Sequence, residues 1–283
     1  MNSVPSPGYM IASLSNKKVG KYFTSSDLSK KGYMPSLGSL TASCTLLSPL
    51  VIVAISPNLY SIPCMDANIL LLIPLIKDCL FCRSAIIDYA IDSLDADFVK
   101  FSSLYETAGE GGTPTTSNVQ FYDNGKIPFI KIDDLKQKYL TENKDFITEL
   151  GLQKSSAWLV PTRSILFSNG ATIGGITITT YPVCTKQGIL GIVPKQNIDV
   201  EFLYYFMSSS YFKKAVSRIV TEGTMKTAYL KDINNILCPI PTEEKQQEIA
   251  KMPSALNSKI DIEQSILKQL ITQKRHLLRQ MFI

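Results

Sequence analysis

The C-terminal residues of the chain alternate between apolar and polar positions with the period of a helix that packs against another helix. With Ile249 at position d of a heptad repeat, seven of the ten a and d positions from 249 to 281 are apolar, which predicts a coiled-coil seam. Thr242 supplies a polar cap, and Glu243 and Glu244 supply the acidic first turn that favours a helix start. The candidate dimerisation or spacer positions of this helix, residues 242–283, are Leu256, Ile260, Leu267, Leu270, Leu277 and Met281.

Three residues interrupt this seam: Pro253, Glu263 and Lys274. A proline inside a helix loses one hydrogen bond and clashes with the preceding turn, so we expect a break at Met252. Glu263 and Lys274 weaken the seam and can set its register. A helix over 254–282 would be about 40 Å long, which is more than one small domain can cover. The pattern therefore predicts a partner helix, and a homodimer through the C-terminal helix would supply one.

Upstream of this helix, the pattern changes to short β-prone runs that Gly, Asn and Pro residues separate. A helix is predicted over Asp199–Val220, with Asp199 as its cap and aromatic residues on one face. Packing in a core explains these aromatic residues better than a base-stacking platform does. The fold class is therefore α+β, with a strand-rich mixed domain over 98–241 and a long helix over 242–283. The β-prone runs are Ile127–Ile132, Ser164–Ser168, Ile173–Thr179 and Ile189–Val193.

The most apolar region, Leu46–Ile76, precedes this domain. Prolines and polar residues interrupt it too often for a membrane-spanning helix, which needs about 20 apolar residues in a row. Its runs Leu50–Ile55 and Ile69–Ile73 have the length and branching of buried strands. Met1–Ser15 lacks the basic start and the apolar stretch of a secretory signal. We therefore expect a cytoplasmic protein without a membrane segment.

The N-terminal segment, residues 1–97, echoes the middle of the chain. Pro63–Pro74 aligns without gaps with Val183–Pro194, and Tyr22–Leu28 resembles Phe129–Leu135. The matches occur in the same order but the first copy is shorter, which suggests a degenerate duplication. Chance similarity between apolar strands that end in proline is the alternative. No long helix is expected between the two copies.

Charge is distributed unevenly along the chain. The formal net charge is +5, yet residues 1–97 carry as many acidic as basic side chains. All of the excess positive charge therefore lies in residues 98–283, which is compatible with nucleic-acid binding without proving it. With 45% hydrophobic and 19% charged residues, the chain is expected to fold rather than to be disordered.

No catalytic constellation is visible in the sequence. His276 is the only histidine, which excludes histidine-based triads and metalloprotease sites. Cys79 and Cys82 form the only C-x2-C pair, whereas a zinc site needs four ligands. Neither a phosphate-binding loop with its lysine nor a motif for methylating a flipped base occurs. The chain is therefore expected to be a non-enzyme without a metal or a cofactor.

Several short stretches together resemble the specificity subunit of type I restriction-modification systems over residues 98–283. No single stretch is diagnostic, and the match rests on their order and spacing. The stretches are Gly111–Thr115, Gly125–Ile130, Ile165–Gly174, Lys186–Ile189, Gly191–Pro194, Glu201–Tyr205 and Pro239–Pro241, followed by Glu243, Gln246, Gln247, Ile249 and Ala250 in the long helix.

The resemblance implies a subunit without catalysis of its own. In the family, two target-recognition domains each read one half of a split site in double-stranded DNA, and two antiparallel helices act as the spacer between them. Modification methyltransferase subunits dock on this subunit, and restriction motor-nuclease subunits join them. This chain resembles one recognition domain with one helix, so a half-subunit that dimerises, or a truncated product, is expected. The alternative is a degenerate protein-interaction module that binds partner subunits through its C-terminal helix without reading DNA.

Candidate DNA contacts follow from the chemistry that each part of DNA requires. Phosphates need cations or backbone N–H groups, for which the candidates are Lys186, Lys213, Lys214, Arg218, Lys226 and the Gly111–Gly112 turn. Base edges need hydrogen-bonding side chains, for which the candidates are Lys131, Asp133, Gln187, Thr224 and Lys226. For each side chain an ordinary exposed residue is the alternative, and the glycines can equally form tight turns without a ligand.

Overall fold

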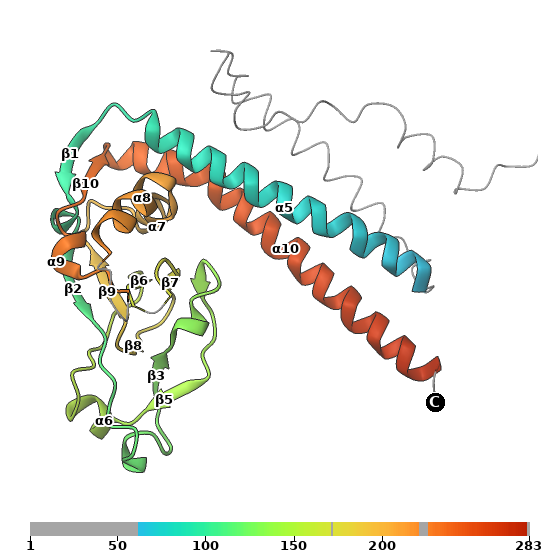
Figure 1. The fold of residues 1–283 in the computed structure, drawn as a ribbon, viewed down its shortest axis with the longest axis horizontal. Coiled ribbons are helices and arrows are strands. Elements are labelled where there is room, and N and C mark those ends of the chain that lie inside the picture. Colours follow the sequence, from blue (N-terminus) through green and yellow to red (C-terminus); the bar gives the residue numbers. More distant parts are fainter. Residues whose placement is uncertain (1–61, 171, 221–225, 282–283) are drawn as a thin grey trace, which may run out of the picture. The chain divides into compact units, whose positions relative to one another are not determined.

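The computed structural model describes residues 62–281, apart from residue 171 and residues 221–225. The predicted strand Leu50–Ile55 and the stretch Tyr22–Leu28 lie outside the described residues. The described part belongs to one compact unit, Ser61–Ile283. Within this unit, a strand-rich domain, here called the central domain (residues 97–240), lies at one end of two long helices (Figure 1).

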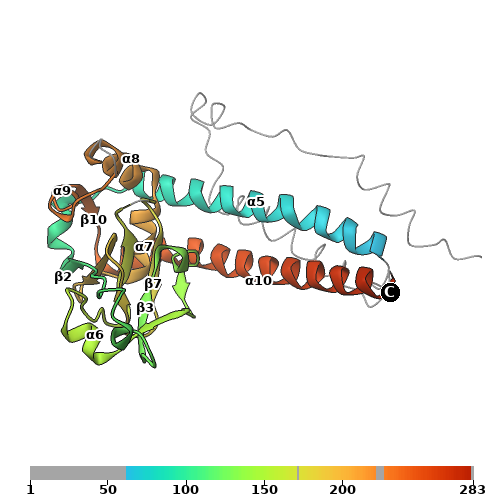
Figure 2. The same ribbon diagram turned by 60° about the horizontal axis from the view of Figure 1, so that its bottom comes forward.

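The two long helices, α5 (Ile62–Asp92) and α10 (Glu243–Met281), pack side by side (Figures 1 and 2). α10 starts where the sequence predicts a helix start. The partner helix that its seam requires is α5 of the same chain. Buried apolar residues form a helical stripe along α5: Met65, Leu72, Leu75, Ile76, Cys79, Ile87 and Ile91.

Two polar contacts fix the direction and the register of this helix pair. Lys274 forms an ion pair with Asp66, and the guanidinium of Arg83 donates a hydrogen bond to Asn257 Oδ1. Between these contacts α5 advances along the sequence while α10 goes back by the same number of residues, so the helices run antiparallel. Lys274, one of the three interruptions of the seam, therefore meets a specific acidic partner.

The predicted break at Pro253 is wrong, because α10 continues through this residue. Pro253 is buried, and so are Ala250, Leu256 and Ile260 around it. A proline costs the helix one hydrogen bond and crowds the preceding turn. Burial of the flanking apolar side chains offsets this cost, so the proline is accommodated without ending the helix.

The predicted strand Ile69–Ile73 is also wrong, because these residues lie within α5. A long helix therefore does precede Phe98, contrary to the expectation from sequence. Pro63–Pro74 is helical, whereas Val183–Pro194 forms strands of the central domain, so their similarity does not reflect a shared fold. A short apolar run does not by itself distinguish a buried strand from a buried helix. Packing against α10, which the run does not reveal, selects the helix here.

Strands β1 (Asp97–Lys100) and β10 (Leu237–Ile240) form the two ends of the central domain, where it joins the helices. They pair antiparallel, with Asp97 opposite Ile240 and Lys100 opposite Leu237. The chain therefore enters the domain from α5 and leaves it towards α10 at the same place (Figure 1).

A five-stranded sheet forms the core of the central domain, in the order β2-β9-β6-β7-β4. Neighbours are antiparallel except for the parallel pair of β4 and β7. Three of the predicted β-prone runs coincide with β6, β7 and β9, which confirms them. The strands are β2 (Tyr105–Glu110), β4 (Tyr139–Leu140), β6 (Ile165–Ser168), β7 (Ile176–Thr179) and β9 (Ile189–Pro194).

A smaller sheet in the order β5-β3-β8 packs next to it. It consists of β3 (Ile127–Ile130), β5 (Asp145–Ile147) and β8 (Cys184–Thr185), and β3 runs parallel to β8. Mixed sheets with covering helices confirm the predicted α+β class. Shorter helical segments are α6 (Glu149–Gln153), α9 (Leu230–Ile233), η1 (Phe101–Ser103), η2 (Val119–Phe121) and η3 (Ile132–Asp134).

Helices α7 (Val200–Ser208) and α8 (Ser210–Ile219) replace the single helix predicted between Asp199 and Val220. Asp199 does cap the first of them, because its Oδ1 accepts a hydrogen bond from the N–H of Phe202 at 2.8 Å. Ser209 caps the second and separates the two. The aromatic residues Phe202, Tyr204, Tyr205, Phe206 and Phe212 are buried, which confirms that they form core. Among the helices of the described residues, none has the length and hydropathy that a membrane span requires.

Candidate nucleic-acid interface

The turn between β8 and β9, here called the β8–β9 turn, carries the exposed side chains of Lys186 and Gln187. Gly188 beside them has a φ of +90°, which residues with a side chain rarely adopt. The N–H of Gln187 donates to Thr113 Oγ1 at 3.4 Å, and that of Gly188 donates to Glu110 Oε1 at 2.9 Å. The backbone of the turn is thus held in place while its two polar side chains remain exposed.

The end of β3 brings Lys131 next to this turn. The N–H of Lys186 donates at 2.9 Å to the carbonyl that precedes Lys131. The Lys131 ammonium forms an ion pair with Asp145 at 2.8 Å, and both side chains are nearly half exposed. Asp133 is exposed and lies 3.7 Å from the ammonium of Lys136. Lys131 and Asp133 line a polar pocket of about 510 Å³, so both predicted base-reading residues lie at an accessible edge.

Asn169 joins the β8–β9 turn to a third segment. Its N–H donates to the Gly188 carbonyl at 3.0 Å, and its own carbonyl accepts from the N–H of Ala228 at 2.9 Å. Its side-chain Nδ2 donates to the Ala228 carbonyl at 3.2 Å. Lys226, two residues before Ala228, is exposed. Asn169 therefore brings the segment that contains Lys226 next to the β8–β9 turn, although the two segments are far apart in sequence.

Asn169 is buried at the point where its own segment, the β8–β9 turn and the segment at Ala228 meet. Asn169 is 1% exposed, and its Oδ1 has no hydrogen-bond partner among the described residues. A Cβ on the neighbouring Gly170 would lie 3.3 Å from the Cα of Gly188, so the two backbones approach closely. In the sequence, Asn169 and Gly170 indicate only a turn between two strands, and the junction is missed.

Lys213 on α8 lies beside the loop that joins β6 to β7, which begins with Asn169. It lines an apolar pocket of about 220 Å³ together with Ile173 and Gly174 of that loop. This position brings Lys213, which is exposed, towards the surface that contains Lys226.

The other predicted phosphate contacts on α8 are not brought to the β8–β9 turn by any contact of the described residues. Lys214 and Arg218 are exposed. Arg218 lies near Tyr211, whose hydroxyl donates to the Leu237 carbonyl of β10 at 2.8 Å. Thr224 lies outside the described residues.

Gly111 and Gly112 are buried beneath this surface. The N–H of Gly111 donates to the Ile189 carbonyl at 2.9 Å, so it is not available to a phosphate. A Cβ on Gly111 would collide with the Thr185 carbonyl, and one on Gly112 would collide with the backbone at Ala157. The geometry favours the alternative interpretation, in which these glycines allow close packing.

The chemistry of the surface is that of binding. Burial, with a contribution from the charge of Glu149, raises the pKa of the nearby Cys184 thiol to about 11, so this thiol stays protonated at neutral pH and is a poor nucleophile. Among the residues that the structure describes, no group of three or more His, Cys, Asp or Glu side chains could hold a metal ion. What the surface offers is cations, an amide and hydrogen-bonding side chains.

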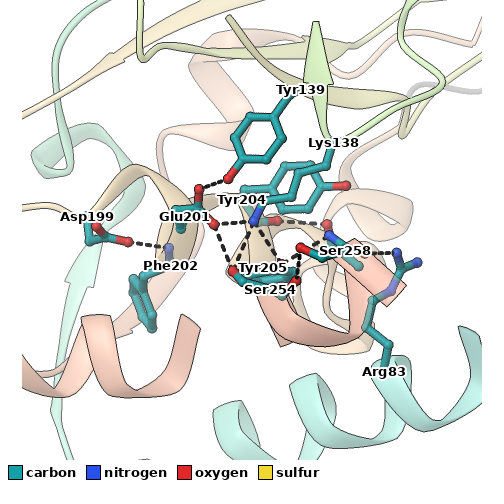
Figure 3. A network of polar contacts seen from close by, with 12 residues as sticks. Arg83, Lys138, Tyr139, Asp199, Glu201, Phe202, Tyr204, Tyr205, Ser254 and Ser258 are labelled. Carbon is teal, nitrogen blue, oxygen red and sulfur yellow. Dashed lines mark hydrogen bonds and ion pairs between the residues drawn. The ribbon is translucent and has the colours of Figure 1, made fainter. Parts of the chain in front are cut away.

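A second polar cluster, which the sequence does not indicate, lies where the central domain meets α10 (Figure 3). Buried Lys138 forms an ion pair with Glu201. Burial alone would raise the pKa of the Glu201 carboxyl, but hydrogen bonds from Lys138, Tyr139 and Ser254, with the charge of Lys138, hold that pKa below its ordinary value. A single lysine in a polar stretch of sequence gives no signal of such a cluster.

Comparison with known families identifies the class of protein to which this fold belongs. Residues 95–272 match the type I restriction modification DNA specificity domain. This match covers more than half of the chain, so the chain belongs to that family.

Two curated relatives give the scale of the similarity. The specificity subunit of the type I restriction enzyme MjaIX from Methanocaldococcus jannaschii is 32% identical over 173 residues, which cover 59% of this chain and 39% of the relative. The EcoR124I/EcoR124II specificity subunit from Escherichia coli is 27% identical over 160 residues, which cover 52% of this chain and 39% of the relative. The chain thus matches less than half the length of either relative.

Solved structures show the same fold. The type I restriction-modification S subunit from M. genitalium superposes with a TM-score of 0.57 at 17% identity, over 77% of this chain and 57% of that one. The HsdS subunit from Thermoanaerobacter tengcongensis gives a TM-score of 0.51 at 14% identity, over 84% of this chain and 54% of that one.

Proposed function

We propose that the chain reads a sequence in double-stranded DNA and is the scaffold subunit of a type I restriction-modification complex, directing methylation and cleavage by partner subunits. The observation that carries this proposal is the exposed surface of Lys186, Gln187 and Lys226, held together by Asn169 within a domain of the DNA specificity family. Lysines neutralise phosphates, and an amide side chain such as that of Gln187 can form two hydrogen bonds with an adenine edge.

The residues of this surface divide the work by their chemistry. Lys186, Lys213 and Lys226 contact phosphates and position the domain, whereas Gln187 and Lys131 face base edges. Lys131 exchanges its ion pair with Asp145 for DNA on binding, which releases the Asp145 carboxylate to accept from a cytosine amino group. Methyl transfer and cleavage belong to modification methyltransferase subunits and a restriction motor-nuclease subunit, and the assembly works in the cytoplasm.

Replacing Lys186 and Lys226 together by Ala tests this surface. Binding to a short duplex of mixed sequence is measured by fluorescence anisotropy over a series of salt concentrations. Each phosphate contact contributes about 0.9 to the slope of log K against log salt, so the double variant is expected to lose about two units of slope.

The matched control removes the same charge elsewhere. Lys154, directly after α6, and Lys251 on α10 are exposed, and the Lys154→Ala, Lys251→Ala variant should keep the native slope. A Lys186/Lys226 variant with the native slope would remove this surface from the proposal.

We further propose that two copies of the chain form a homodimer through the C-terminal helix. Because α5 already packs on the seam of α10, a second copy would have to pack on residues outside the seam, where Ile262 and Ile271 are exposed. Replacing both by Glu is expected to reduce the mass in light scattering from two chains to one. A native mass of one chain would contradict the homodimer.

An exposed apolar surface on α5 is a candidate contact for partner subunits, and its side chains Leu70, Leu71 and Phe81 are exposed by 60% or more. The alternative function, a protein-interaction module that does not read DNA, would instead bind partner subunits through the C-terminal helix α10. Capture of methyltransferase subunits, combined with no duplex binding at any salt concentration, would select this alternative over DNA reading.

A further inference from the structure

The junction between the central domain and the helix pair contains a buried hydrogen-bond network centred on Lys138 (Figure 3). Its ammonium donates to Glu201 Oε2, to the Tyr205 hydroxyl at 2.9 Å and to Ser254 Oγ at 3.0 Å. An ammonium has three donors, so all of them are used. Only 5% of the Lys138 side chain is exposed, and a buried charge of this kind requires such complete pairing.

Hydroxyl groups carry the network from the central domain on to α10. The Tyr205 hydroxyl donates to Ser254 Oγ at 3.1 Å, and Ser254 Oγ donates to Glu201 Oε2 at 2.8 Å. The second carboxylate oxygen of Glu201 accepts from Tyr139. Each of the two hydroxyls that accepts from Lys138 therefore donates its own proton onward, and Glu201 is the final acceptor.

Asn257 extends the same network to α5. Its Nδ2 donates to the Tyr205 hydroxyl at 3.0 Å, and its Oδ1 accepts from Arg83. Asn257 is buried as well. The network thus joins four elements: Lys138 next to β4, Glu201 and Tyr205 on α7, Ser254 and Asn257 on α10, and Arg83 on α5.

The central sheet holds Lys138 on the other side. The Lys138 carbonyl accepts from the N–H of Ile178 at 2.7 Å and from Thr177 Oγ1 at 3.2 Å, both in β7. The ammonium also lies 4.8 Å and 4.7 Å from the ring centroids of Tyr139 and Tyr205, within reach of cation–π attraction. Lys138 is therefore tied at its backbone to the sheet and at its head group to the helices.

Such a network contributes more to geometry than to net stability. Desolvation of a buried ion pair largely cancels the attraction between its charges. Hydrogen bonds nevertheless have preferred lengths and directions, and a rotation of the domain would leave buried groups without partners. Apolar packing is non-directional and opposes such a rotation less.

We propose that Arg83, Lys138, Glu201, Tyr205, Ser254 and Asn257 form a polar lock, which holds the central domain in one orientation on the α5–α10 pair. The lock fixes the direction in which the β8–β9 turn faces relative to the two helices. Its members are positioning residues, and the lock does not depend on the proposed function because orientation is defined without DNA.

The Lys138→Met, Glu201→Gln variant tests the lock in the full chain. It removes both charges at similar side-chain volume and leaves no buried charge unpaired. Spin labels on non-natural amino acids at the exposed positions Lys154 and Arg275 report the distance from the central domain to the far end of α10 by pulsed EPR. The native chain should give one narrow distance distribution, and the variant one that is roughly twofold broader because the directional contacts of the Lys138 ammonium are gone.

The matched control is Lys245→Met, Glu248→Gln, which removes the same charges from an exposed ion pair on α10 and should keep the native distribution. Near-UV circular dichroism and the thermal midpoint show whether each variant is folded. Should the first variant not fold, Asn257→Leu breaks the link between Tyr205 and Arg83 without changing the Lys138–Glu201 pair.

A folded lock variant with the native distribution width would overturn the proposal. Because the measurement contains no DNA, that result would leave the proposed function standing. A native salt slope in the Lys186/Lys226 variant would contradict the DNA surface and would not bear on the lock. The failure of one proposal is therefore distinguishable from the failure of the other.

Discussion

Both helices of the pair bury apolar residues against each other, but their outer faces differ in polarity. Outside its seam α10 is mostly polar and charged, whereas α5 exposes Leu70, Leu71, Phe81 and Tyr89. A polar outer face makes an apolar seam visible as a heptad pattern, and an apolar outer face hides it. The same packing is therefore readable from sequence in one helix and unreadable in the other.

The largest expected effect comes from testing whether α5 is helical where the sequence predicts a strand. Leu71 is 67% exposed, so a substitution there acts mainly on the backbone. Leu71→Pro removes a helical hydrogen bond and clashes with the preceding turn, which should lower the free energy of unfolding by about 3 kcal/mol. Urea unfolding followed by circular dichroism measures it. Leu71→Ala should stay within about 0.5 kcal/mol of native, and equal stabilities of the two variants would contradict a helix at this position.

A smaller effect tests the polar interruption that distinguishes the seam of α10 from the stripe of α5. Glu263 is 5% exposed, and its Oε2 has no hydrogen-bond partner among the described residues. Its other oxygen lies 3.9 Å from Lys259. Glu263→Leu should raise the free energy of unfolding by about 1–3 kcal/mol, because an unpaired buried acceptor is replaced by apolar packing.

The control for this gain is Glu248→Leu, at an exposed position of the same helix. It should leave the urea midpoint nearly unchanged. A loss of stability in Glu263→Leu would mean that the carboxylate has a structural role in the register of the pair.

The smallest effect concerns Glu201 of α7, which accepts a hydrogen bond from Ser254 of α10. The pKa of this carboxyl is lower in the folded chain than its ordinary value of 4.5, so the unfolded chain binds the proton more readily. The stability that results is present above the ordinary pKa and is lost as pH falls through the lower folded pKa. Glu201→Gln should therefore flatten the decline of the free energy of unfolding in acid, as measured by urea unfolding at stepped pH.

Glu248→Gln is the comparison for this pH dependence. A hydrogen bond and the charge of Lys245 also lower the pKa of Glu248, but this carboxyl is fully exposed and solvent screens the pair. Its removal should change the pH profile less than Glu201→Gln does. Identical profiles for native and Glu201→Gln chains would contradict the role assigned to the buried pair.

Local patterns predicted the central domain better than they predicted its connections. The strands β6, β7 and β9 follow from apolar runs between turn residues, and the Asp199 cap follows from a single side chain before a helix. In contrast, Arg83 and Asn257 lie 174 residues apart, and they meet only because two helices pack in one register. No local pattern encodes such a meeting.

In the candidate DNA surface, too, local sequence predicts single residues but not the contacts that bring them together. Lys186 and Lys226 could be predicted as single exposed cations, but the residue that brings their segments together, Asn169, is a buried amide without a pattern of its own. Gly111 and Gly112 show the reverse case. Their dipeptide suggested an anion-binding turn, and the structure uses the missing side chains for close packing instead.

The pairing of β1 with β10 has a consequence for how such chains can recombine. The central domain is an insertion whose two ends are neighbours, with Lys100 opposite Leu237. We therefore expect that a gene segment for the residues between them can be exchanged as a cassette, provided that the contacts of the domain with α5 and α10 are kept. The incoming cassette must still bring a cation to Ser254 and a hydroxyl to Asn257. Recombinant chains should therefore keep these boundary contacts while the surface around the β8–β9 turn diversifies.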